Sequence, residues 1–193
     1  MVNDAQQAGD FDLSVIVPVH NAERHLEKLA GTVFGLGRKG LRCQMICVDD
    51  ASSDASPAIL RDLAATHPDL IAILGDDNRG AGIARNEGWP LASGRYALFF
   101  DADDILHGEV LADAIRDMDA APDIDLAMFA YRYEREETAS FTDMNYDDRK
   151  TLDLLLKGQA VETGRIEDMA GLLTFTNYPW NKGSDAGGGR ILR

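Results

Sequence analysis

The sequence predicts an α/β fold with a mostly parallel central sheet flanked by helices. Short apolar runs rich in Val, Ile and Leu are too brief for helices and indicate strands. They alternate with segments whose apolar residues recur at helical spacing, and clusters of Gly, Pro, Asn and Asp separate the two kinds of segment. Strands that alternate with helices are joined by right-handed crossovers into parallel sheets. The 193 residues suffice for an α/β domain with a sizeable core.

The first strand is expected at residues 13–19, Leu-Ser-Val-Ile-Val-Pro-Val. Pro18 cannot donate a hydrogen bond to a sheet ladder, so it belongs at the strand's end, and residues 18–21 should form a turn. A helix is then expected from Asn21 or Ala22 onward. Its apolar face comprises Leu26, Leu29, Val33 and Phe34.

The second strand is expected at residues 44–48, followed by a helix at residues 56–65. Asp49 and Asp50 end this strand, and a strand does not need two charges in order to stop. Both are therefore candidates for a site. Asp54, in contrast, is explained as a cap of the following helix.

A short third strand is expected at residues 70–74, and a helix that carries Arg85 at residues 81–91. Three glycines lower the helix propensity here by roughly 1 kcal/mol each relative to Ala. They are Gly80, Gly82 and Gly88. Such a loss is easier to understand if the backbone approaches a ligand or the neighbouring sheet.

The fourth strand is expected to be central and covered on both faces, because residues 96–100 are five apolar or aromatic residues in a row. Three carboxylates follow it: Asp101, Asp103 and Asp104. Ligands of open α/β sheets bind beyond the carboxyl ends of strands, and crowded carboxylates repel one another unless a cation neutralises them. Oxygen ligands suit Mg²⁺ or Mn²⁺, so the pattern predicts a metal and diphosphate site. The alternative is an acidic turn in which Asp103 or Asp104 caps the next helix.

The remainder of the chain is expected to contain a helix at residues 108–118 and a strand at residues 126–131. Residues 134–150 are charged and looplike, and short helices are expected at 151–157 and 166–173. Residues 183–193 are glycine-rich and without periodicity, which predicts disorder.

Composition limits the functional classes. The chain carries 19 basic and 33 acidic residues, a net charge of -14, which argues against nucleic-acid binding. Its start lacks the pattern of a signal peptide and no apolar run reaches the roughly 18 residues of a membrane span, so a cytoplasmic protein is expected, with peripheral membrane association left open. Cys43 and Cys47 lack the partners of a zinc site and are expected to be reduced core residues.

Four stretches together resemble the donor domain of the inverting glycosyltransferases of family two, which have the GT-A fold. They are Ser-Val-Ile-Val-Pro-Val-His-Asn (14–21), Ile-Cys-Val-Asp-Asp-Ala-Ser-Ser-Asp (46–54), Asn-Arg-Gly-Ala-Gly-Ile-Ala-Arg-Asn-Glu-Gly (78–88) and Phe-Asp-Ala-Asp-Asp (100–104). Pro-Trp-Asn-Lys (179–182) also resembles a segment of members that build surface polysaccharides. The resemblance implies a GT-A type nucleotide-diphospho-sugar transferase fold.

The resemblance also implies roles for individual residues. Pro18 and Val19 would line the base pocket through backbone atoms, and Asp50 would read the edge of the base, usually uracil. Asp101 would hold the ribose or diphosphate side. Asp103, with Asp101, would bind the Mn²⁺ or Mg²⁺ that bridges the diphosphate.

Three further positions are implied near the nucleotide. Arg85 and Gly80 would lie beside the same pocket. Glu23 would face the nucleotide, although an acid in the first turn of a helix is also favoured by the helix dipole alone.

The mechanism implied is a single displacement that moves sugar from a nucleotide-diphospho-sugar, with UDP-sugar preferred, to a glycan or lipid-linked acceptor. A carboxylate would take the acceptor's proton. Asp168 is the candidate base, although its Glu-Asp pair precedes Trp180, whereas the family places this pair after the matching residue. We expect residues 1–135 to bind the donor and residues 136–193 to be a partial, truncated acceptor region with little transfer activity.

Two other classes share parts of this pattern. A phosphorelay receiver domain also gathers acids at strand ends, but its acid pair follows the first strand, and here a full strand and helix precede Asp49. A sugar nucleotidyltransferase would place a glycine-rich basic loop directly after the first strand, and residues 18–24 lack it.

Overall fold

The computed structural model describes residues 11–121 without a gap, and beyond them residues 126–128, 132–135, 140–143, 149–151, 153–154 and 189–191. The chain divides into two compact units, Met1–Gly108 and Glu109–Arg193. The division expected from the sequence, between donor and acceptor regions at 135 and 136, concerns function and stays a prediction. Each unit is described by itself.

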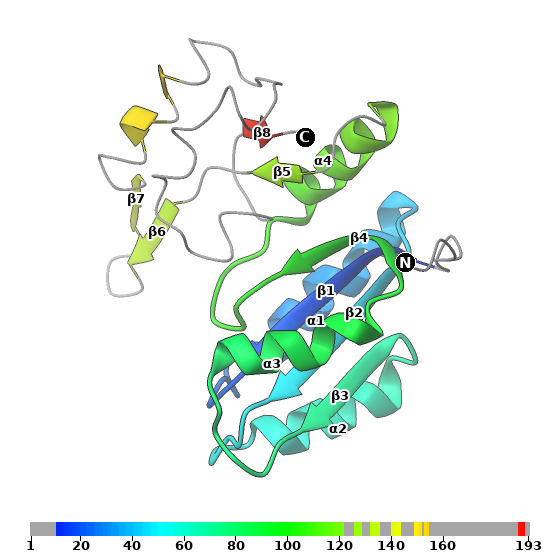
Figure 1. Cartoon of the computed structure of the whole chain (residues 1–193), viewed down its shortest axis with the longest axis vertical. Helices are drawn as coiled ribbons and strands as arrows, with labels where there is room; N and C mark the ends of the chain where they lie inside the picture. The colour runs from blue at the N-terminus through cyan, green and yellow to red at the C-terminus, as the bar shows by residue number, and fades with distance from the viewer. Residues whose placement is uncertain are drawn as a thin grey trace, which may run out of the picture. The chain divides into compact units, whose positions relative to one another are not determined.

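The first unit contains a four-stranded parallel sheet. Its strands are β1 (Phe11–Val19), β2 (Cys43–Asp49), β3 (Leu70–Leu74) and β4 (Gly94–Phe99). Their order is β3-β2-β1-β4, and every neighbouring pair is parallel (Figure 1). The expected α/β fold with a mostly parallel sheet is confirmed.

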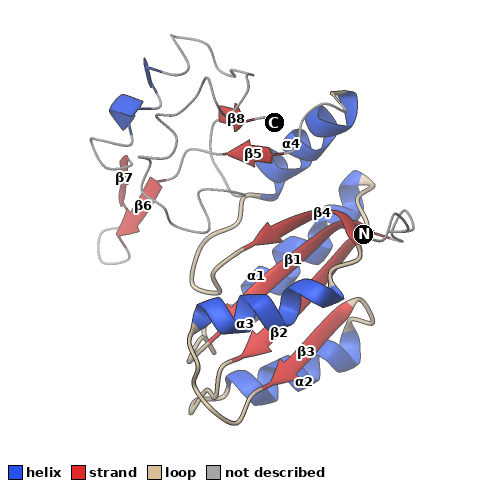
Figure 2. Cartoon of the chain, viewed as in Figure 1, coloured by secondary structure: helices blue, strands red, loops and turns tan. Residues whose placement is uncertain are grey.

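Helices cover both faces of this sheet (Figure 2). On one face lie α1 (Leu26–Gly35) and α2 (Ser56–Thr66), and on the other lies α3 (Ala81–Gly88). The short 3₁₀ turns η1 (Leu36–Lys39) and η2 (Trp89–Leu91) continue α1 and α3. The unit therefore has three layers, with the carboxyl ends of all four strands at one edge.

The core is centred on the two inner strands. Every residue of β2 is buried, and β1 is buried from Leu13 to Val19. Ile16, Ile46 and Val48 pack with Ala84 of α3. A Cβ added to Gly88 would lie 2.7 Å from the Ile16 side chain, so the absence of a side chain lets α3 approach the sheet.

In the part of the chain that the structure describes, the fourth strand is neither central nor covered on both faces, contrary to the expectation. Within the described residues β4 lies at the end of the sheet, and only Leu98 of its six residues is buried. Trp89 covers part of the exposed face by stacking on Phe99, with ring centroids 5.5 Å apart. A strand at the end of a sheet can therefore have the same apolar sequence pattern as a central strand when a nearby side chain, here Trp89, packs on it.

The helix predicted from Asn21 or Ala22 begins only at Leu26. The backbone N–H groups of residues 21–23 donate to side chains of a neighbouring turn instead of entering a helix. The helix predicted over 81–91 ends at Gly88 and passes into η2, where Pro90 cannot supply a helical N–H.

All of α4 (Gly108–Ala120) except its first residue belongs to the second unit, and this helix has a buried face around Leu111 and Ile115. Strand β5 (Leu126–Met128) pairs antiparallel with β8 (Gly189–Ile191), and β6 (Arg132–Arg135) pairs antiparallel with β7 (Ser140–Asp143). Two expectations are therefore corrected: 189–191 is a strand rather than disordered, and the looplike stretch 134–150 contains strand residues. No helix in the described part of the chain has both the length and the apolar character needed to cross a bilayer.

Candidate functional site

The acids predicted from the sequence lie at one edge of the sheet. Asp49 ends β2 and Asp50 follows it, and Asp101 lies two residues beyond the end of β4. Strand β1 runs between β2 and β4, so its end, at Pro18 and Val19, separates the two acidic tips. Segments more than 80 residues apart in the sequence thus form one edge.

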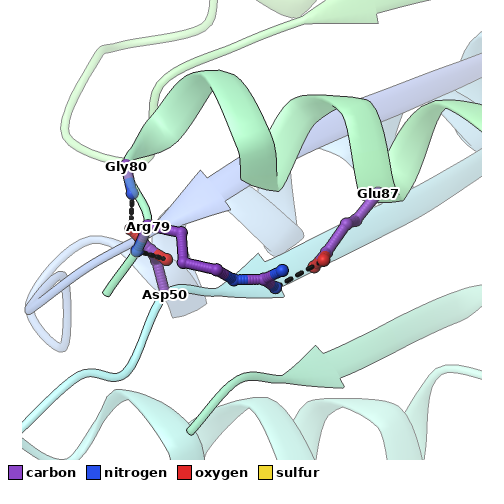
Figure 3. A network of polar contacts seen from close by, with 4 residues as sticks. All are labelled: Asp50, Arg79, Gly80 and Glu87. Atoms are coloured by element: carbon purple, nitrogen blue, oxygen red, sulfur yellow. Dashed lines mark hydrogen bonds and ion pairs between the residues drawn. The ribbon is translucent and has the colours of Figure 1, made fainter. Parts of the chain in front are cut away.

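Asp50 holds the start of α3. Its Oδ1 accepts a hydrogen bond from the Arg79 backbone N–H and its Oδ2 accepts one from the Gly80 N–H, both at 2.7 Å (Figure 3). A carboxylate is favourable there because the amino end of a helix carries partial positive charge. Each oxygen keeps a second lone pair for a ligand, and Asp50 as a whole residue is only 7% exposed.

Gly80 also has a conformational role, because its φ of 88° lies in the region that residues with side chains rarely adopt. The glycines of this segment thus have separate explanations. Gly80 allows the turn before α3, and Gly88 allows close packing on the sheet. A Cβ at Gly82 would meet no atom within 4 Å, so packing within the described residues does not require glycine there.

Arg85 and Asp101 form an ion pair between α3 and the loop after β4. Their side chains are 18% and 21% exposed. The Arg85 Nε is buried and, among the described residues, has no hydrogen-bond partner. The structure therefore brings together two residues that the sequence placed in the same pocket, and it leaves donor capacity on the guanidinium.

The loop after β4 is a tight acidic turn. The Asp104 N–H donates to the Asp101 carbonyl at 3.2 Å, while Asp103 is exposed. Burial, followed by the charges of Asp103 and Asp101, raises the pKa of Asp104 to about 7. Its Oδ2 is buried with no hydrogen-bond partner in the described part of the chain. Within the described residues, Arg85 pairs with one acid of this turn, Asp101, while the buried Asp104 oxygen is left without a partner.

This donor set fits a divalent cation. Mg²⁺ and Mn²⁺ accept carboxylate oxygens and keep several coordination positions for water or phosphate. No cluster of three His, Cys, Asp or Glu side chains arranged around a metal occurs among the described residues. One or two carboxylates completed by a diphosphate are therefore the arrangement that the turn supports.

Two turns beside the site are joined by hydrogen bonds between the ends of β1 and β2. The Asn21 N–H donates to Ser52 Oγ at 2.9 Å, and the Ser53 N–H donates to Asn21 Oδ1 at 2.8 Å. Asn21 and Ala51 have positive φ, 52° and 54°. Such backbone typically costs about 1 to 3 kcal/mol and persists where its surroundings hold it, often at functional sites.

Glu23 and Asp54 belong to the same pair of turns. Glu23 Oε2 accepts from the Ala55 N–H at 2.9 Å, and Asp54 Oδ2 accepts from the Glu23 N–H at 3.1 Å. Asp54 Oδ1 accepts from the N–H of Ser56, the first residue of α2. Glu23 precedes α1, so the alternative that it is a first-turn acid of that helix is wrong. Its role toward a nucleotide stays a prediction.

Asp49 is 2% exposed, and its Oδ2 accepts from the Ser52 N–H at 3.1 Å. Side chains alternate along a strand, so Asp49 points to the sheet face opposite that of Asp50. Its Oδ1 is buried without a hydrogen-bond partner among the described residues. Of the two acids at this strand end, only Asp50 faces α3.

An open hollow of about 510 Å³ lies beside the end of β3. It is lined by Ile73, Leu74, Gly75, Asp76, Asp77, Arg79 and Glu87. The Arg79 side chain runs along α3 and pairs with Glu87 (Figure 3). Because Asp50 binds the Arg79 backbone, this hollow adjoins the base-reading position predicted from the sequence.

Sequence reasoning missed two residues at this edge, His20 and Asn78. His20 Nδ1 lies 2.9 Å from the Asp50 carbonyl oxygen, and Asn78 Nδ2 lies 3.3 Å from the same ring nitrogen. The Pro-Val-His-Asn turn was a visible signal, but the proximity of Asn78 depends on the β3 to α3 connection. Asp168 and residues 179–182 lie outside the described residues.

A parallel sheet with acids at the ends of β2 and β4, a helix amino end held by the first acid and an Arg paired with the second is typical of the α/β domains that bind ligands at the carboxyl ends of their strands. Comparison with known proteins identifies it further. The chain belongs to glycosyl transferase family 2, whose model matches residues 14–180. The match agrees with the resemblance found in the sequence and decides against the receiver and nucleotidyltransferase interpretations.

Curated relatives include biosynthesis proteins of bacterial teichoic acid and succinoglycan. The minor teichoic acid biosynthesis protein GgaB of Bacillus subtilis is 33% identical over 101 residues, which are 52% of this chain and 11% of the relative. The succinoglycan biosynthesis protein ExoO of Rhizobium meliloti is 33% identical over 110 residues, 57% of this chain and 30% of the relative. The chain thus spans a third or less of the length of these proteins.

Solved structures confirm the GT-A type fold. Residues 1–349 of S. aureus TarS, in complex with UDP, match with a TM-score of 0.52 and 28% identity over 62% of this chain and 35% of that chain. The mannosyltransferase PcManGT of Pyrobaculum calidifontis, in complex with GDP-Man and Mn²⁺, has a TM-score of 0.57 over 94% of this chain and 56% of that chain. Its 19% identity shows likeness of fold alone.

Proposed function

We propose that this chain binds a nucleotide-diphospho-sugar, with a UDP-sugar preferred, and takes part in its transfer to a glycan or lipid-linked acceptor with inversion. The observation that carries the proposal is that α3 contacts both acidic strand ends, Asp50 at its amino end and Asp101 through Arg85. Family membership and the UDP complex of S. aureus TarS support the same chemistry.

In this proposal the base lies against the ends of β1 and β2. Backbone atoms of Pro18 and Val19 line it, and the free lone pairs of Asp50 accept from its ring N–H. Gly80 lets the turn before α3 come close without a side chain, and Arg85 keeps Asp101 oriented toward the ribose or diphosphate.

Asp103 and Asp101 are proposed to hold Mn²⁺ or Mg²⁺. A bound cation would supply charge neutralisation for the diphosphate as it departs. The raised pKa of Asp104 and its unpartnered buried oxygen support a cation at this turn. Asp168 stays the candidate base that takes the acceptor's proton.

The test is calorimetric titration of UDP into the protein with and without Mn²⁺. We expect Mn²⁺-dependent binding in the wild type and severe loss in Asp103→Ala. Equal binding by the two proteins would remove Asp103 from the metal site, and absence of UDP and GDP binding in the wild type would overturn the donor role. Asp113→Ala, an exposed acid in α4, is the matched control and should bind like the wild type.

A further inference from the structure

His20 joins three segments at the edge where the donor is proposed to bind. It follows β1, its Nδ1 lies 2.9 Å from the Asp50 carbonyl oxygen after β2, and its ring nitrogens lie 3.3 and 3.4 Å from Asn78 Nδ2 before α3. A third contact, 3.1 Å long, joins His20 Nε2 to Asn21 Nδ2. The imidazole thus contacts groups from the segments that follow β1, β2 and β3.

The contacts of Asn21 determine which nitrogen of His20 carries the proton. Asn21 Oδ1 accepts from the N–H and the hydroxyl of Ser53, at 2.8 and 3.2 Å, so the oxygen of this amide must face Ser53. The Asn21 NH₂ group therefore faces His20 and donates to Nε2. Nε2 must be unprotonated, and the neutral imidazole carries its hydrogen on Nδ1, which donates to the Asp50 carbonyl.

The peptide bond between Asp50 and Ala51, whose carbonyl His20 contacts, leads into a residue with an unfavourable backbone conformation. Ala51, directly after Asp50, has a φ of 54° in a region that a residue with a Cβ rarely adopts. The Asp50 N–H is already fixed by the Val19 carbonyl at 2.7 Å. The hydrogen bond from His20 Nδ1 to the Asp50 carbonyl oxygen fixes the carbonyl side of Asp50, and with it the peptide bond between Asp50 and Ala51.

The orientation of Asp50 determines the position of the loop before α3. Its carboxylate accepts from the N–H groups of Arg79 and Gly80 and sets where this loop begins. Rotation of the peptide between Asp50 and Ala51 alone leaves the Asp50 Cβ in place, but a backbone that is no longer held at the Asp50 carbonyl is freer to shift at Cα, and such a shift would lengthen those two bonds. His20 holds one end of this linkage by donating from Nδ1 to the Asp50 carbonyl, and in this tautomer only Nε2, 3.4 Å from Asn78 Nδ2, can accept from the other end.

We propose that His20 is a positioning residue of the donor site, which acts as the neutral Nδ1–H tautomer by clamping the peptide between Asp50 and Ala51, and so keeps the Asp50 carboxylate on the loop before α3. The inference rests on the proposed function for its effect on nucleotide binding. The tautomer of His20 and its hydrogen bond to the Asp50 carbonyl concern the ligand-free protein and do not depend on that function.

Two variants separate the hydrogen bond from the ring. His20→Phe keeps an aromatic ring and removes both nitrogens. His20→Asn removes the ring, but its amide nitrogen can occupy nearly the same place as Nδ1 and donate to the Asp50 carbonyl. If the hydrogen bond matters, His20→Asn should behave more like the wild type than His20→Phe does.

The first measurement is made on the wild-type protein without ligand. Two-bond ¹⁵N–¹H couplings of the imidazole at neutral pH should show hydrogen on Nδ1, and a predominant Nε2–H tautomer would overturn the proposal. Amide hydrogen exchange then follows the N–H groups of Arg79 and Gly80. We expect their exchange to be faster by about five- to tenfold in His20→Phe and close to wild type in His20→Asn, as suits the loss of one hydrogen bond.

The second measurement is the affinity for UDP with Mn²⁺, which should fall about five- to tenfold in His20→Phe and less than about threefold in His20→Asn. Equal losses in the two variants, or none in either, would overturn the positioning role. A wild type that fails to bind UDP would count against the proposed function alone, because the tautomer and the amide exchange still decide whether His20 holds the loop. If His20→Phe does not fold, the tautomer and His20→Asn decide it.

Discussion

Individual side chains at the carboxyl edge have more than one role, and Asp50 is the clearest example. Its carboxylate anchors the start of α3 through two 2.7 Å hydrogen bonds and is also the proposed reader of the base. Asp101 pairs with Arg85 and is also proposed to hold the ribose or diphosphate side. Substitutions at these positions therefore change stability and binding together, and experiments must separate the two.

Asp50→Asn should lower the free energy of unfolding by about 1 to 3 kcal/mol, because one backbone N–H loses its charged acceptor and faces an amide NH₂. The measurement is urea unfolding. Under the proposed function, UDP affinity should fall more than the affinity for inorganic diphosphate, which lacks a base. Asp76→Asn, in the exposed loop after β3, is the control and should change stability little. Unchanged stability in Asp50→Asn would contradict the anchoring role.

Asp104 should make the metal-free protein less stable as pH rises. Its pKa is raised to about 7, by burial first and then by Asp103 and Asp101, whereas an unfolded Asp titrates near 4. Between these values the folded state holds a proton that the unfolded state has lost. The contribution of Asp104 to the free energy of unfolding is therefore fully present below about pH 4 and is lost as pH rises through about 7.

The measurement compares the pH dependence of urea unfolding, with a chelator present, between the wild type and Asp104→Asn. The difference between the two curves should change over this window and level off above pH 8. Parallel curves would show that the Asp104 carboxyl titrates normally. Added Mn²⁺ should reduce the pH dependence of the wild type if the cation binds at this turn.

Among the elements, α3 connects packing with the site. Its amino end is held by Asp50, its middle supplies Arg85, and its last residue, Gly88, touches the sheet. A shift of this helix would move all three together. The position of α3 on the sheet is consequently the structural variable on which the candidate site depends most.

Gly88→Ala should destabilise the protein by about 1 to 3 kcal/mol, although Ala favours helices by roughly 1 kcal/mol. The added Cβ would lie 2.7 Å from Ile16 and 3.2 Å from Val48, so α3 must move. Gly82→Ala is the matched control in the same helix. It meets nothing within 4 Å and should stabilise by up to about 1 kcal/mol. Thermal unfolding measures both, and equal effects would contradict the packing explanation.

For the molecule as a whole, the buried strands give a direct probe of unfolding. Cys43 and Cys47 are buried, free cysteines on β2, as expected from the sequence. Burial raises the pKa of each thiol to about 12, with a further contribution from Asp12 at Cys43. Both thiols are therefore protonated and shielded at neutral pH.

Iodoacetamide should label Cys47 only when β2 opens, because this residue lies inside the sheet. Mass spectrometry should show little labelling of the native protein at pH 8 and complete labelling in urea, with a midpoint that matches global unfolding. Rapid labelling in native conditions would mean that β2 opens locally. Cys47→Ser provides the control for labelling at Cys43.

The sequence by itself determined the order and type of the elements in the first unit, since apolar periodicity and turn residues are local properties of the chain. It also determined which acids end the strands, and the resemblance carried by four ordered stretches led to the correct family. These conclusions need no knowledge of which segments meet in space.

Only the tertiary structure decided which strand is central and what the site residues contact. β4 has the apolar pattern of an inner strand, yet it lies at the end of the described sheet, because strand order depends on crossovers and not on local composition. The contacts of Asp50 with Arg79, of Asp101 with Arg85 and of His20 with Asn78 are likewise invisible in the sequence. They exist because parallel strands bring distant turns to one edge, where hydrogen bonds between those turns fix the geometry.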